Sequence, residues 1–202
     1  MDYLAQAGPR IGACAGDSLR VKVLAQLRNP QLEAATLVSF RYNDFDLTTG
    51  QIDRPSSNAL VELILRASLH GARIQIVTRD PFSQADEFLG TRAFKSWYLG
   101  LERLARANVE IRIHPTLHSK LYLFSLKNAV RFYAIGSSNL TAQGMGYGWL
   151  ECNAFGYHGA DFGVLRDAAG KILGDRRIET FDFWERRLRK NLAYARLVGP
   201  RA

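Results

Sequence analysis

The sequence predicts an α/β fold, with a mixed, mostly parallel β-sheet flanked by helices on both faces. The first observation behind this prediction is that short β-branched and aromatic segments alternate with longer segments of helical periodicity. The second is that two strand-like segments follow each other directly in the second half of the chain, which predicts a late hairpin. We find no internal repeat and no linker, so we expect a single domain over residues 1–202 with its core at about 34–195.

Local signals define the elements of the first half. Ser18 is a candidate cap for a helix that Asn29-Pro30 would stop. Gly71 is a good stop for a second, strongly apolar helix. Runs of β-branched and aromatic residues indicate the strands. In chain order, we predict helix 19–28, strand 34–42, a long loop over 43–58, helix 59–70 and strand 73–81.

The second half begins with a helix that Thr91 can cap and that runs to about Ala107. Its aromatic and leucine stripe has helical spacing, and we interpret it as core packing. The stripe consists of Phe94, Trp97, Tyr98, Leu101 and Leu104. The remaining predicted elements are strand 109–115, hairpin strands 117–126 and 129–136, strand 149–157, and helices 161–173 and 180–195.

The last predicted helix has one apolar and one basic face. Its apolar stripe is Phe181, Trp184, Leu188 and Leu192, and its basic residues are Arg186, Arg187, Arg189 and Lys190. A solvated charged face is the favoured interpretation, and contact with a phosphate backbone is the alternative.

Composition limits the classes of function. The formal net charge is +8, which favours polyanionic partners such as nucleic acid or an acidic membrane surface. No apolar run approaches the length of a membrane span, and the N-terminus lacks a signal pattern. Cys14 and Cys152 are too few for a disulfide framework or a zinc site. We therefore expect a cytoplasmic protein with reduced cysteines.

One pair of side chains has the chemistry of a phosphate site. If residues 118–124 form a strand, His118, Lys120, Tyr122 and Phe124 share one face, because side chains alternate between the faces of a sheet. An imidazole and an ammonium are then held side by side. That arrangement supplies a nucleophile and a cation that stabilises negative charge on phosphoryl oxygens.

The motif around this pair resembles the signature of the phospholipase D superfamily, H-x-K followed by G-S-x-N and a downstream glutamate. Here the pattern reads His118-Ser119-Lys120, Gly136-Ser137-Ser138-Asn139 and Glu151. The resemblance covers most of residues 34–195 and implies one half-unit of the phospholipase-D-like fold.

The resemblance also implies a mechanism that needs neither metal nor cofactor. His118 would attack phosphorus and form a phosphohistidine, while Lys120 and Asn139 would hold the phosphoryl oxygens. Glu151 would accept the ring N–H of His118 opposite the attacking nitrogen and so fix the tautomer. Ser137 would bind a phosphate oxygen or steady the loop.

Two features depart from the family pattern. The acidic residue of the signature falls at Ser125, and fifteen residues separate Lys120 from Gly136, which is more than usual. Strand parity turns position 125 to the face opposite His118, so we expect the usual acid to be structural. The extra residues fit a longer hairpin that turns at Lys127-Asn128.

The chemistry needs a second imidazole, because a general acid must protonate the leaving oxygen. The chain carries one motif, and single-motif members of the family pair two chains around a two-fold axis. We therefore expect an obligate homodimer that cleaves DNA, with RNA as the alternative substrate. Two alternatives remain open: a phospholipid hydrolase or phosphatidyl transferase, and a non-catalytic nucleic-acid-binding module, which Ser125 keeps open.

The other histidines lack a motif. We expect a structural role for His114 at a strand end and a helix-capping role for His70, and we find no obvious partner for His158. The loops at Arg41–Phe45 and Asp80–Gly90 follow strands and either shape substrate entry or are ordinary surface loops.

Overall fold

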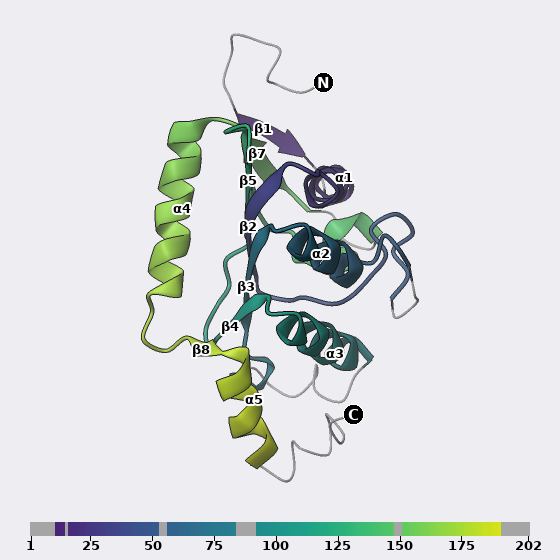
Figure 1. Cartoon of the computed structure of the whole chain (residues 1–202), viewed down its shortest axis with the longest axis vertical. Coiled ribbons are helices and arrows are strands. Elements are labelled where there is room, and N and C mark those ends of the chain that lie inside the picture. Colours follow the sequence, from purple (N-terminus) through teal and green to yellow (C-terminus); the bar gives the residue numbers. More distant parts are fainter. Residues whose placement is uncertain (1–10, 15, 53–55, 84–91, 148–150, 191–202) are drawn as a thin grey trace.

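Figure 1 shows a computed structural model of the whole chain, which describes residues 11–14, 16–52, 56–83, 92–147 and 151–190. Within these ranges the strands form one eight-stranded sheet in the order β1-β7-β6-β5-β2-β3-β4-β8. The strands are β1 (Ile11–Cys14), β2 (Leu32–Ser39), β3 (Arg73–Arg79), β4 (Glu110–His114), β5 (Leu121–Leu126), β6 (Arg131–Gly136), β7 (Asn153–Gly156) and β8 (Glu179–Thr180). The helices are α1 (Gly16–Leu27), α2 (Leu60–Leu69), α3 (Arg92–Arg106), α4 (Gly159–Leu173) and α5 (Phe181–Lys190).

The sheet is mixed, as predicted, but the expectation that it is mostly parallel is wrong. Only β2 with β3 and β3 with β4 pair in parallel among the described strands. The pairs β1–β7, β2–β5, β4–β8, β5–β6 and β6–β7 are all antiparallel. The reason is that the hairpin β5–β6 and the following strand β7 continue the sheet beyond β2, where no crossover helix reverses the chain.

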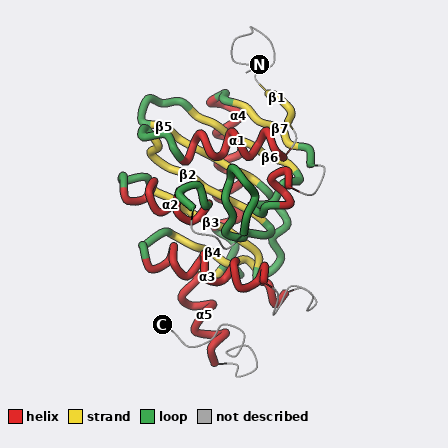
Figure 2. The backbone as a smooth tube through the Cα atoms, turned by 90° about the vertical axis from the view of Figure 1, so that its right-hand side faces the viewer, coloured by secondary structure: helices red, strands yellow, loops and turns green. Residues whose placement is uncertain are grey.

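Helices cover both faces of the sheet, which confirms the predicted α/β class. In Figure 1 the sheet is seen edge-on, with α4 on one side and α1, α2 and α3 on the other. Figure 2 shows α1, α2 and α3 side by side in front of the strands. The described helices are not long and apolar enough for any of them to cross a membrane.

Two hydrophobic cores follow from this layering. The larger core contains the residues of β5 at even positions, together with the predicted stripe of α3 and the buried face of α2. The smaller core contains Leu121 and Leu123 of β5 and packs against Phe162 and Ala169 of α4. The alternation along β5 therefore places Tyr122 and Phe124 on the face opposite Leu121 and Leu123, as parity requires.

Most predicted elements are present within a few residues of their expected bounds. Helix α1 begins at Gly16, so Ser18 lies inside the helix and does not cap it. Helix α2 ends as expected, with Gly71 in the left-handed region at φ 88°. The expected cap Thr91 and the stripe residue Leu192 lie outside the described residues. Strands β1 and β8 were not predicted, and the single-domain organisation stays a prediction.

Candidate active site

The ends of five strands meet at one edge of the sheet. In the register of the sheet, Val38 near the end of β2 pairs with Leu121 at the start of β5, and Leu121 also pairs with Ile135. Gly136 at the end of β6 pairs with Asn153 at the start of β7. The strand β3 ends beside β2 at the same edge. This topology brings the loops that follow β2, β3 and β6 together with the loop that precedes β5.

The predicted pair His118 and Lys120 lies in this loop before β5. Residues 118–120 are not part of the strand, which begins at Leu121, so the expected strand over 118–124 is correct only for its second half. The pair is nevertheless held together. Lys120 Nζ lies 3.4 Å from His118 Nδ1 and donates a hydrogen bond of 2.8 Å to the His118 carbonyl. The His118 ring is exposed, whereas Lys120 is buried.

Burial shifts the pKa of Lys120. Desolvation lowers the pKa of the Lys120 ammonium below its ordinary value, and the negative charge of Glu151 offsets part of that effect. Glu151 is half-buried and acts on this ammonium across space. Within the described part of the chain, no hydrogen bond joins Glu151 to His118, and the imidazole contacts the Lys120 ammonium through Nδ1.

The lowered pKa predicts that the folded protein is destabilised by its own Lys120 ammonium. A lysine whose folded pKa lies below its unfolded value costs stability at neutral pH, and this cost disappears as the pH rises toward the unfolded value of about 10.4. We expect Lys120→Met to unfold at a higher denaturant concentration than the wild type at pH 7. The difference should shrink as the pH rises toward the unfolded value. A variant that is less stable at pH 7 would contradict this prediction.

The loop from Gly136 to Asn139 is fastened to the start of β7. The Ser137 N–H donates to the Cys152 carbonyl at 3.1 Å, and the Cys152 N–H donates to Ser137 Oγ at 3.0 Å. Ser138 and Asn153 exchange two further hydrogen bonds, of 3.2 and 2.8 Å. The hydroxyl of Ser137 thus forms hydrogen bonds with the backbone of Cys152, and its contact with a phosphate stays a prediction.

Asn139 ends this loop and is buried. Its side-chain Oδ1 accepts a hydrogen bond of 3.1 Å from the Arg41 N–H, in the loop that follows β2. Next to it, Leu140 donates its N–H to Ser39 Oγ and accepts the Asn43 N–H, each at 2.9 Å. Because Oδ1 is used in this way, the amide N–H groups of Asn139 are the ones available to an incoming anion.

Gly136 is required by a close backbone approach. A Cβ at this position would lie 2.5 Å from the Cys152 carbonyl oxygen and 2.7 Å from Asn153 Cα. We expect Gly136→Ala to lower the free energy of unfolding by about 1–3 kcal/mol in chemical denaturation. Gly163→Ala is the matched control, because no atom lies within 4 Å of a Cβ there and the position is helical. The control should be stabilised by about 0.5–1 kcal/mol. Equal stabilities for the two variants would contradict the prediction.

The sequence analysis did not identify Phe40 and Arg79. The Phe40 ring lies 5.1 Å from the His118 ring, measured between centroids, with a tilt of 44°. Arg79 ends β3 and has its guanidinium carbon 5.1 Å from the centroid of Phe40. The expectation that the loop after the first strand borders the site began at Arg41, one residue too late. Both residues lie at the carboxyl end of a predicted strand, where ligands of α/β sheets usually bind, and this rule could have identified them.

The position of Ser125 agrees with the parity argument. It lies in β5 between Ala34 of β2 and Arg131 of β6. Its neighbours Tyr122 and Phe124 belong to the core on the side of α1 to α3, so Ser125 faces the other side of the sheet, with Leu121 and Leu123. The residue that replaces the usual acid therefore points away from the face of Tyr122.

The other three histidines have positions or partners of their own. His114 is buried at the end of β4, where Nε2 lies 3.3 Å from Asp175 Oδ2, so its role in the fold is structural. His70 is the C-terminal cap of α2, as expected. His158 precedes α4 and has a partner that the sequence did not indicate, Asp161 Oδ2 at 3.3 Å. No group of three or more His, Cys, Asp or Glu in the described ranges has the arrangement of a metal site.

Comparisons with known proteins agree with this geometry. The family model described as "Cardiolipin synthase, PLD-like domain" matches residues 40–161, which include Phe40, His118, Lys120, Asn139 and Glu151. A search of curated proteins finds no match in sequence.

Several solved structures share the fold at low sequence identity. The phospholipase D family member Nuc from Salmonella typhimurium is 12% identical with a TM-score of 0.59, and the match covers 85% of this chain and 98% of that chain. NucT from Helicobacter pylori is 12% identical with a TM-score of 0.56, and the match covers 85% and 99%. Phosphatidylserine synthase from Haemophilus influenzae is 14% identical with a TM-score of 0.55, and the match covers 85% of this chain and 40% of that chain.

Proposed function

The chain belongs to the phospholipase D-like family, and on this basis we propose that it is a metal-independent phosphodiesterase that cleaves nucleic acid, DNA in preference to RNA. The observation that carries the proposal is the meeting of His118, Lys120 and the Asn139 loop at one edge of the sheet. The net charge of +8 favours a polyanionic substrate.

The proposed reaction has two steps. A ring nitrogen of His118 bonds to phosphorus as the bond from phosphorus to the leaving nucleoside oxygen breaks, and that oxygen takes a proton from a second imidazole. Water then attacks phosphorus, gives a proton to the second imidazole and releases His118. Because Nδ1 faces Lys120, the attacking atom is Nε2.

Lys120 and Asn139 stabilise the charge that develops on the phosphoryl oxygens. A bound phosphate attracts the Lys120 ammonium away from Nδ1 of His118, which leaves that nitrogen to carry the ring proton. Glu151, whose charge already acts on Lys120, is the acceptor that we propose for this proton's hydrogen bond. Each donor to the phosphate contributes about 3–4 kcal/mol in a water-poor site.

The second imidazole comes from a second copy of the chain. The chain contains four histidines, and the structure gives the other three different roles: His70 caps α2, His114 contacts Asp175 and His158 contacts Asp161. We propose a homodimer whose two-fold axis passes between the two His118 rings, so that one ring attacks and the other protonates the leaving group. The exposure of His118 supports this arrangement.

The experiment that tests this function is cleavage of labelled DNA by the purified protein in the presence of EDTA. We expect cleavage under these conditions, with RNA cleaved more slowly. Cleavage that appears only after magnesium is added would contradict the mechanism, because a phosphohistidine pathway takes its positive charge from Lys120 and the imidazoles.

A phospholipid substrate is the second candidate. Two findings favour it: the matching family model is described as a cardiolipin synthase domain, and the phosphatidylserine synthase structure shares the fold. Incubation with vesicles of phosphatidylglycerol tests it. Turnover of the lipid without any cleavage of nucleic acid would replace the first proposal by this one.

A further inference from the structure

Three cationic side chains surround the ring of Phe40, the residue that follows β2. The guanidinium carbons of Arg79 and Arg41 lie 5.1 and 5.4 Å from the ring centroid, and Lys120 Nζ lies 5.3 Å from it. The His118 imidazole packs against the same ring at 5.1 Å. The proposed nucleophile and three positive charges are therefore gathered around one aromatic side chain.

A phosphate bound among these side chains would meet several positive charges at once. A cation–π contact contributes about 0.5–2 kcal/mol, and repulsion among neighbouring like charges has a similar order at a protein surface. An anion bound between the cations lowers the repulsion among them. Lys120 is assigned to the scissile phosphate, and one phosphate does not need two further guanidinium groups. The planar fork of arginine is well suited to a phosphate of its own.

We propose that Arg41 and Arg79 form a second phosphate subsite, which binds the phosphate next to the scissile one in a nucleic-acid strand. This inference rests on the proposed function and specifies its substrate. It requires a substrate with at least two consecutive phosphates, and it places Phe40 between the two subsites.

The fold fixes the backbone of both arginines. Arg79 is the last residue of β3 and pairs with His114 of β4, and the preceding Thr78 accepts a hydrogen bond of 3.5 Å from Trp97 Nε1. Arg41 donates its backbone N–H to Asn139 Oδ1, and its carbonyl accepts a hydrogen bond from Ser39 Oγ. The hydrogen bond between Arg41 and Asn139 therefore connects the second subsite to the loop that holds the scissile phosphate.

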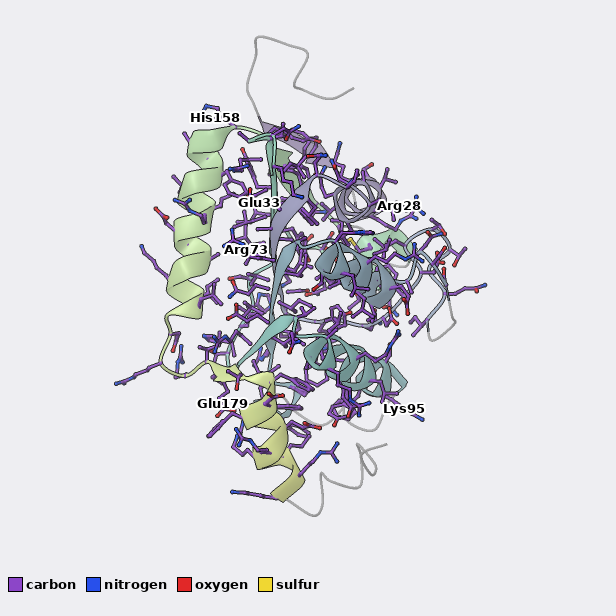
Figure 3. All side chains as sticks on the ribbon, in the orientation of Figure 1. Arg28, Glu33, Arg73, Lys95, His158 and Glu179 are labelled. Atoms are coloured by element: carbon purple, nitrogen blue, oxygen red, sulfur yellow. The ribbon has the colours of Figure 1, made fainter. Side chains whose placement is uncertain are left out.

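The test compares two substrates that differ by one phosphate. A thymidine dinucleotide contains one phosphodiester, and a thymidine trinucleotide contains two. We expect Arg79→Gln and Arg41→Gln each to lower kcat/KM for the trinucleotide by about 10- to 100-fold, the loss of one charge-assisted hydrogen-bonded contact. The dinucleotide should lose much less activity in both variants, because it has no second phosphate to bind. Arg73→Gln is the matched control, because Arg73 lies at the opposite end of β3, beside Glu33 at 3.8 Å (Figure 3).

Two results with the same substrates would overturn the proposal. Equal losses on both substrates would mean that the arginines support the catalytic pair, and no loss on either would mean that they bind no phosphate. A failure of the proposed function looks different, because the wild type would then cleave neither substrate. In that case the binding of a labelled oligonucleotide decides: binding that Arg79→Gln leaves unchanged overturns the subsite, as does turnover of phosphatidylglycerol vesicles that depends on Arg79.

Discussion

We expect the His118→Ala variant to cleave DNA at least about 10⁴-fold more slowly than the wild type, because it lacks the atom that bonds to phosphorus. His118 is exposed, so the substitution removes no buried side chain and the fold should persist. The measurement is the cleavage rate of a labelled oligonucleotide in EDTA under single-turnover conditions. Chemical denaturation of both proteins is the control for folding.

The same variant separates catalysis from binding. The Lys120 ammonium, the Asn139 loop and both arginines remain in His118→Ala, so its affinity for an uncleaved oligonucleotide should stay close to that of the wild type. A variant that retained more than about a tenth of the wild-type cleavage rate would show that another group attacks phosphorus. A wild type that binds DNA and never cleaves it would favour the non-catalytic binding module.

Mixing the two proteins tests the shared site. If each active site needs one His118 from each subunit, a heterodimer of wild type and His118→Ala lacks either the nucleophile or the general acid. After complete exchange of subunits in an equimolar mixture, the activity should fall to about half, since half of the wild-type chains are then in heterodimers. Activity that stays constant on mixing would contradict the homodimer.

The fold was predictable wherever the local pattern determines the structure. The periodicity of Phe94, Trp97 and Leu101 predicted α3, and the apolar and aromatic run from Leu121 to Leu126 predicted β5. Strand partners are not a local property. Residues of β2 pair with β3 in parallel and with β5 antiparallel, and the residue pattern of β2 does not distinguish the two directions. The sequence therefore could not predict whether most strands pair in parallel or antiparallel.

The short elements escaped prediction for a related reason. The strand β8 is the pair Glu179–Thr180, which is too short to show any period, and it exists because Arg112 and Ile113 of β4 offer an open edge. The strand β1 is four residues long and likewise depends on a distant partner, β7. Such strands are created by tertiary pairing.

The candidate site divides in the same way. His118, Lys120 and Asn139 could be identified because they occur in one motif. Phe40 follows β2 and Arg79 ends β3, and it is the order of strands in the sheet that brings them to His118. The contact between Lys120 and His118 Nδ1 depends on side-chain conformations that a residue pattern does not encode. The motif indicates the candidate reacting groups, and the topology of the sheet determines which other side chains surround them.

We expect Asn139→Asp to separate the two functions of Asn139. Aspartate keeps an oxygen that accepts the Arg41 N–H, so the contact between the two loops should survive. It replaces the amide N–H donor by a second oxygen and adds a negative charge where the phosphate binds. The loss of one such donor lowers kcat by about 10²–10³-fold, and the added charge increases that loss.

The matched variant Asn139→Ala removes the acceptor as well as the donor. It should lose a similar share of activity and in addition about 1 kcal/mol of stability, because the part-buried hydrogen bond from the Arg41 N–H is lost. The comparison uses kcat on DNA and the midpoint of chemical denaturation for both variants. If Asn139→Asp kept more than about a tenth of the wild-type kcat, the amide would not touch the transition state, and Asn139 would only connect the loop after β6 to the loop after β2.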